Sequence, residues 1–130
     1  MPEVNLLAVV VAAASSFMLG GLWYSAALFG RTWSVEANAP MDKQGHPAKV
    51  FGGAFVFSLL AAYAFAVYLG PKPELRFAVH AGAMVGFCWV ASSFGINYLF
   101  AQRSLKLWLI DAGYHTLQFT LYGLVLGLWH

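Results

Sequence analysis

Charged side chains are scarce in this 130-residue sequence, where only 9% of the residues are Asp, Glu, Lys or Arg. A soluble domain carries about 25% charged residues, so this chain has too few to cover a surface that faces water. Hydrophobic residues make up 61% of the chain instead. The formal net charge of +2 is too small to indicate nucleic-acid binding. The composition therefore predicts an integral membrane protein whose first partner is the lipid bilayer.

The sequence is equally poor in catalytic and metal-binding patterns. Its single cysteine, Cys88, excludes an intrachain disulfide and a cysteine metal cluster, and its apolar neighbours favour a buried structural thiol. No HExxH, Ser-His-Asp or glycine-rich phosphate pattern is present. His80 and His115 are expected at different depths, which disfavours a haem that both would ligate. We expect no metal and no other cofactor, and the sequence gives only weak support to an enzymatic activity.

Long apolar stretches are abundant. Four of them carry few or no charges and cover residues of about 4–30, 50–70, 77–102 and 105–129. Each reaches the roughly 20 residues that a helix needs to cross a hydrocarbon core. The pattern predicts one all-α domain over residues 1–130, a four-transmembrane-helix bundle.

The distribution of basic residues predicts the orientation of these spans. Two loops on one side hold five basic residues, and the loop on the other side holds two. The larger set belongs in the cytoplasm, which places both termini outside. The segment from Arg31 to Glu36 is either an interfacial helix anchored by Trp33 or an ordered loop.

Small residues recur every four positions in the apolar stretches. In lipid, such rows let helix backbones approach closely, and their ordinary role is packing within one bundle. Homo-oligomerisation is the alternative, because four rows exceed the need of one compact bundle. The glycines expected at these contacts are Gly20, Gly82, Gly86, Gly123 and Gly127.

The last stretch contains an ionisable pair, Asp111 and His115. Four residues apart on a helix, the two side chains share one face, and Gln118 and Tyr122 continue that face. A carboxylate within the membrane costs several kcal/mol unless it is paired, hydrated or neutralised. Compensating groups must therefore lie nearby.

The rise of about 1.5 Å per residue predicts which groups share the depth of Asp111. Asp111 follows Lys106 by five residues, which places it roughly 7 Å below the cytoplasmic boundary. Asn97 and Tyr24 reach nearly the same level, and His115 lies about 6 Å deeper. Asp111, His115, Asn97 and Tyr24, with Gln118, form a candidate polar site that either holds the last two helices in register or binds a proton or ligand.

Two signatures in the sequence resemble a known family. The first comprises Gly20-Gly-Leu-Trp23-Tyr24-Ser25, Leu28-Phe29-Gly30 and Trp33. The second comprises Asn97-Tyr98-Leu99-Phe100, Arg103, Leu105-Lys106-Leu107 and Ile110-Asp111-Ala112-Gly113-Tyr114. Over nearly the whole chain the sequence is similar to a bacterial family catalogued as domain of unknown function 1761. The resemblance implies a small four-helix protein of the bacterial inner membrane, with termini that the charge pattern places in the periplasm. It implies no activity.

Two functions remain open from the sequence. The first is small-solute or proton-linked binding or transport by a homo-oligomer, with Asp111 titrating, His115 as relay, and Tyr24 and Asn97 as ligands. The second is a non-catalytic structural or assembly subunit of a larger membrane complex. A lipid-modifying enzyme ranks third, because no nucleophile and base can be paired.

Overall fold

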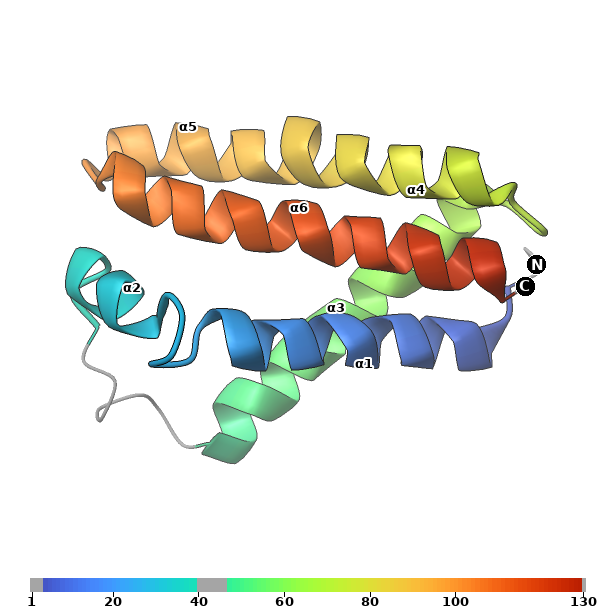
Figure 1. The fold of residues 1–130 in the computed structure, drawn as a ribbon, viewed down its shortest axis with the longest axis horizontal. Helices are drawn as coiled ribbons and strands as arrows, with labels where there is room; N and C mark the ends of the chain where they lie inside the picture. Colours follow the sequence, from blue (N-terminus) through green and yellow to red (C-terminus); the bar gives the residue numbers. More distant parts are fainter. Residues whose placement is uncertain (1–3, 40–46, 130) are drawn as a thin grey trace.

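Long helices account for all four apolar stretches in the computed structural model, which describes residues 4–39 and 47–129 (Figure 1). The helices are α1 (Leu6–Trp23), α2 (Gly30–Glu36), α3 (Pro47–Leu69), α4 (Leu75–Met84), the π-helical segment η2 (Val85–Ala91), α5 (Ser92–Phe100) and α6 (Leu105–Leu128). The last helix before α6 is continuous, because α4, η2 and α5 follow one another without a break and form one rod. The prediction of an all-α fold is confirmed.

The predicted count of four helices is wrong, because the first apolar stretch is split. Within the described residues there are five helices when the rod is counted once, and the additional helix is α2. α1 ends at Trp23 rather than near residue 30, and the amide of Gly30 donates to the carbonyl of Ser25 at 2.8 Å. A Cβ on Gly30 would lie 2.2 Å from the carbonyl oxygen of Tyr24, so only glycine permits this turn.

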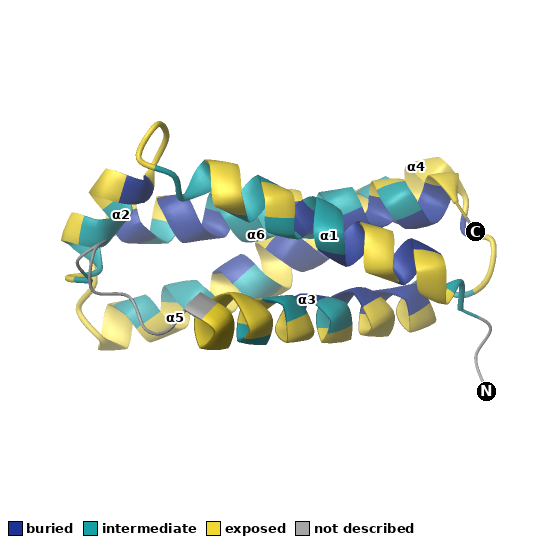
Figure 2. Cartoon of the chain, turned by 90° about the horizontal axis from the view of Figure 1, so that it is seen from below, coloured by how far each residue is buried: buried dark blue, intermediate teal, exposed yellow. Residues whose placement is uncertain are grey.

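Three helical stretches are long and apolar enough to cross a membrane: Leu6–Trp23, Ala48–Leu69 and Leu75–Phe100. Their outer surfaces expose large apolar side chains, as the face of α3 that points away from the bundle shows (Figure 2). This pattern suits lipid and supports the prediction of a membrane protein. α6 is not among the three, because it carries Asp111, His115 and other polar residues.

α6 is the central helix. It packs against α4, η2 and α1, so much of its surface contacts protein rather than the surroundings. Burial on several sides explains why polar residues are tolerated along it, since neighbouring helices supply partners that lipid lacks.

Glycines set the distance between α6 and the rod. A Cβ on Gly82 would lie 2.1 Å from the carbonyl oxygen of Phe119, and one on Gly123 would lie 2.1 Å from that of Ala78. A Cβ on Gly86 would lie 2.6 Å from the carbonyl oxygen of His115. The two backbones therefore touch over several turns.

Two other predicted packing glycines lie at wider contacts. A Cβ on Gly127 would lie 3.0 Å from Leu75, and one on Gly20 would lie 3.2 Å from the hydroxyl of Tyr114. The structure thus places all five glycines named from the sequence between helices of the same chain.

The bundle has two distinct ends (Figure 1). The α2 end carries α2 and the loop of residues 101–104, and the terminal end carries Val4, the loop of residues 70–74 and Trp129. Cys88 lies on η2 between them and is exposed, contrary to the expected buried thiol. An apolar run in a membrane-type helix faces outward as readily as inward, so apolar neighbours did not imply burial.

Candidate functional site

Asp111 lies on α6 near the α2 end and is only 6% exposed. The hydroxyl of Tyr24 donates to its Oδ1 atom, and the hydroxyl of Tyr98 donates to its Oδ2 atom, each at 2.5 Å. The two tyrosines come from the residue after α1 and from α5. Both carboxylate oxygens are therefore satisfied by neutral donors. Hydrogen bonds to a buried acid of this kind offset the cost of its burial.

Aromatic side chains hold Tyr24 in position. Its ring meets the rings of Trp33 and Tyr114 edge-on, with centroids 5.9 and 5.4 Å apart. Trp23, directly before it, donates from Nε1 to the carbonyl of Ile110 at 2.9 Å, and its ring packs on Gly113. The end of α1 is thus fixed to the turn of α6 that carries Asp111.

Asn97 does not join Asp111. It is exposed and lines a groove of about 300 Å³ with Trp89, Val90, Ser93 and Phe94. Its neighbour Tyr98 supplies the hydrogen bond instead. Depth along the membrane depends only on the rise of the helix, whereas each residue also turns it by about 100°. The level was therefore predictable, but the side of α5 that faces α6 was not.

His115 takes part in a second set of hydrogen bonds. Its Nδ1 atom lies 2.6 Å from Oε1 of Gln118, so Nδ1 donates to that carbonyl oxygen. Nε2 of Gln118 in turn donates to the hydroxyl of Tyr122 at 2.7 Å. The imidazole stacks on Phe94 with centroids 4.8 Å apart. Asp111 and His115 lie four residues apart, one helical turn, on the same face of α6.

Two serines extend these bonds to the neighbouring helices. The hydroxyl of Tyr122 lies 2.6 Å from Oγ of Ser58 on α3, and that atom lies 2.9 Å from Oγ of Ser16 on α1. Ser16 also donates to the carbonyl of Ala13 at 3.0 Å. Tyr122 and Ser16 are fully buried. We call Asp111 and the connected residues the polar column; its members are Asp111, His115, Gln118, Tyr122, Ser58 and Ser16.

The serines and Tyr98 are the members of the site that sequence reasoning missed. Ser16 and Ser58 occupy positions in the rows of small residues and were interpreted only as packing residues. A hydroxyl in such a row packs like alanine, yet it also donates and accepts a hydrogen bond. The serines in these rows therefore indicated the site as well as helix packing.

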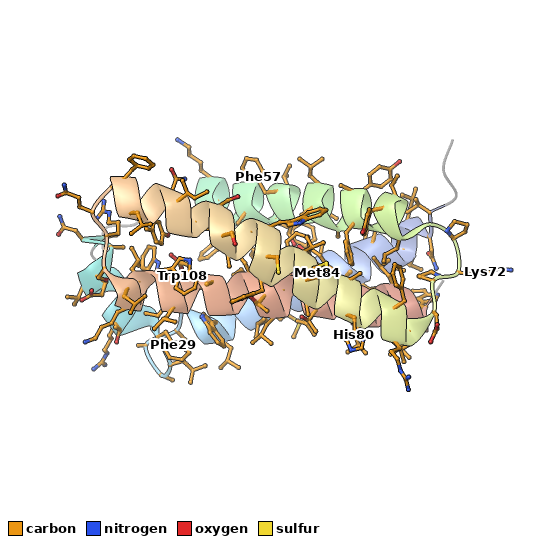
Figure 3. All side chains as sticks on the ribbon, turned by 90° about the horizontal axis from the view of Figure 1, so that it is seen from above. Phe29, Phe57, Lys72, His80, Met84 and Trp108 are labelled. Carbon is orange, nitrogen blue, oxygen red and sulfur yellow. The ribbon has the colours of Figure 1, made fainter. Side chains whose placement is uncertain are left out.

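The described residues contain no cluster of three or more His, Cys, Asp or Glu side chains that a metal ion would require. His80 is exposed on α4 (Figure 3). His115 is stacked and hydrogen-bonded instead.

These features define a class: an all-helical protein with membrane-type outer helices and a polar column on its central helix. The chain itself belongs to the family described as protein of unknown function (DUF1761), whose model matches residues 7–127. This match confirms the resemblance noted in the sequence. No curated protein and no solved structure matches the chain.

Proposed function

We propose that this protein binds or transports a small solute in a proton-linked manner, with Asp111 as the group that gains and loses the proton. The observation that carries the proposal is the polar column, in which a buried carboxylate lies one turn from a hydrogen-bonded chain. That chain runs from His115 through Gln118 and Tyr122 to Ser58 and Ser16. Buried ionisable residues in membrane helices are functional candidates for this reason.

The members of the column other than Gln118 have the chemistry that a relay needs, and the amide of Gln118 positions its neighbours by accepting from His115 and donating to Tyr122. A carboxylate and an imidazole both accept a proton, and a hydroxyl both accepts and donates a hydrogen bond. His115 uses Nδ1 for Gln118 and lies one helical turn from Asp111, so a relay would exchange protons with the carboxylate across that turn.

The titratable groups that surround Asp111 come from every element packed around it. Tyr24 follows α1, Tyr98 is on α5, and Tyr114 and His115 are on α6. Arg103 lies in the loop before α6, where its Nη1 atom donates to the carbonyl of Ala37 at 3.3 Å. Its guanidinium is thus engaged with the C-terminal end of α2 rather than with the carboxylate.

We place the protein in the bacterial inner membrane with α1, α3, the α4–α5 rod and α6 as four spans. The α2 end would face the cytoplasm and both termini the periplasm. The support is the excess of basic residues in the loops at the α2 end, which include Arg31, Lys49, Arg103 and Lys106. A fifth, Lys43, lies outside the described residues.

We also propose that the protein works as a homo-oligomer. The first turns of α3 leave small residues unpacked, since a Cβ on Gly52 or Gly53 would have no neighbour within 4 Å. A second copy that packs there would bury them. Light scattering in detergent should give a mass of at least two chains, and Gly52→Leu should reduce it. A parent protein that is strictly monomeric at micromolar concentration would refute this part.

A structural or assembly subunit of a larger complex is the second candidate. It is favoured by one observation: within the described chain, every buried side-chain nitrogen or oxygen has a hydrogen-bond partner. A fully satisfied network also serves to fix helix register.

The substitution Asp111→Asn separates the two candidates, because asparagine is nearly isosteric and keeps hydrogen-bonding capacity without the charge. Trp108 is the reporter, since it lies one turn from Asp111 and its Nε1 donates to the carbonyl of Ala91 at 2.8 Å. Its fluorescence is obtained by difference against Trp108→Phe and followed across pH, with Glu74→Gln as the exposed-carboxylate control. We expect Asp111→Asn to melt like the parent and to lose the pH response that Glu74→Gln retains. An unaltered pH response in Asp111→Asn would leave only the structural role.

A further inference from the structure

The polar face of α6 ends in one large apolar side chain. Asp111, His115, Gln118 and Tyr122 lie at offsets that return to the same side of a helix, and Leu126 is the next residue in that series. Leu126 is 5% exposed and belongs to the hydrophobic core. It lies one turn, about 6 Å, beyond Tyr122 toward the terminal end.

A cavity begins on the other side of Leu126. It has a volume of about 430 Å³ and lies at the terminal end. Its lining includes Leu126 and Ala66 from the core, Asn5 before α1, Lys72 in the loop and Trp129. The side chain of Lys72 extends outward from that loop, past the end of the bundle (Figure 3). At about 30 Å³ for each molecule of water, the cavity has room for roughly a dozen.

Between the cavity and the polar column lies a thin apolar layer. It contains small side chains, with Ala12 and Ala62 fully buried, and larger ones that include Val9 and Phe65. Leu126 is the residue of α6 that lines the cavity, and it directly continues the face that carries Tyr122. We therefore expect the separation of the cavity from Tyr122 to depend on this leucine.

We propose that the cavity at the terminal end is the second entrance to the polar column and that Leu126 is the residue that closes it. The inference rests on the proposed function and adds a route by which water and protons reach Tyr122 from the side opposite Asp111. Displacement of the Leu126 side chain would join the cavity to the hydroxyls of Tyr122 and Ser58. The titratable groups along this route are Lys72 at the rim, and Tyr122 and His115 at the inner end.

The test measures proton entry into sealed lipid vesicles that contain the full chain and a trapped pH-sensitive dye. Leu126→Ser and Leu126→Ala should raise proton permeability about tenfold or more over the parent, because either change removes the apolar barrier. Leu124→Ser is the matched control, since Leu124 is exposed two residues away on the same helix, and it should behave like the parent. Circular dichroism and thermal melting verify that each variant is folded.

A thiol-labelling arm reports water access without any proton readout. In a Cys88→Ala background, Ser58→Cys should resist a small hydrophilic thiol reagent when Leu126 is present and should react when Leu126 is replaced by serine. Ala66→Cys, which lines the cavity, should react in both cases. If both Leu126 variants fold but neither leaks protons nor exposes Cys at position 58, the inference is overturned.

The two proposals fail in different ways. If Leu126→Ser leaks and adding Asp111→Asn leaves the leak unchanged, the entrance is supported and Asp111 is not the proton-binding group. If Asp111→Asn abolishes the pH response of Trp108 and the Leu126 variants have the proton permeability of the parent, the proton site is supported and this entrance is refuted.

Discussion

Asp111 depends on two phenol hydroxyls that reach it from different helices. Because each oxygen of the carboxylate accepts one of them, the loss of either hydroxyl leaves one oxygen of a buried acid without its donor. The same two bonds tie α5 and the end of α1 to α6. At the scale of single residues, these two hydrogen bonds therefore also hold α5, α6 and the end of α1 together.

The first prediction concerns these tyrosines. Tyr24→Phe and Tyr98→Phe should each lower the free energy of unfolding by about 1 kcal/mol, in the range of interhelical hydrogen bonds measured in membranes. Tyr63→Phe is the control, since it removes the same hydroxyl from a tyrosine that is 38% exposed on α3. Reversible unfolding in detergent with added denaturant measures the difference. Equal stability of all three variants would show that the hydrogen bonds to Asp111 contribute nothing to the free energy of unfolding.

The positions of the long helices in the sequence were predicted well, whereas the side of each helix that faces its neighbours was not. Apolar runs were sufficient to predict the long helices and the depth at which Tyr24 and Asp111 meet. They were insufficient to predict that Tyr98, rather than Asn97, faces α6, because a shift of one residue changes the side but hardly the depth. The break after Trp23 was also missed, since it depends on a backbone contact at Gly30 that hydropathy does not record.

At the scale of helix pairs, the second prediction uses the glycines between α6 and the rod. Gly82→Ala and Gly123→Ala should each destabilise the fold by about 1–3 kcal/mol, because the added methyl group would lie 2.1 Å from a backbone oxygen. Gly21→Ala on α1 is the matched control, because a Cβ there meets nothing within 4 Å and Gly21 lies outside the proposed contact between copies. It should be neutral or slightly stabilising, since alanine favours helix more than glycine does.

Thermal melting of the three glycine variants in the same detergent decides this prediction. If Gly82→Ala melts at the same temperature as Gly21→Ala, α4 and α6 are not in backbone contact. An oligomer that dissociates while each chain stays as stable as the parent would indicate that Gly82 packs against a second copy instead.

At the scale of the whole molecule, the two ends of the bundle differ in charge and in shape. The α2 end carries most of the basic loop residues and the Asp111 site, and the terminal end carries the cavity beside Leu126. In the proposed orientation, protons would exchange with the cytoplasm near Asp111 and with the periplasm through the cavity.

The third prediction tests this orientation. A reporter that is active only in the periplasm should be active when fused after His130 and inactive when inserted near Gly45, since the loops after the first and third apolar stretches hold five basic residues and the remaining loop holds two. A cytoplasmic reporter at the same positions is the control and should give the reverse pattern. Activity of the periplasmic reporter at Gly45 alone would invert the topology and exchange the roles of the two ends.

The most direct test of the central claim is the infrared carboxyl band of Asp111 followed through a pH titration of the folded protein. The chain has only five Asp and Glu residues, so the difference between the parent and Asp111→Asn isolates one group. Exposed Glu74 provides a control, because Glu74→Gln removes one carboxyl group and should leave the band of Asp111 in place. We predict that the parent shows a protonated carboxyl band that appears reversibly as the pH falls and is absent from Asp111→Asn. If the parent and Asp111→Asn give the same pH-dependent difference spectrum while both remain folded, Asp111 does not exchange a proton and the account of the polar column as a proton site is wrong.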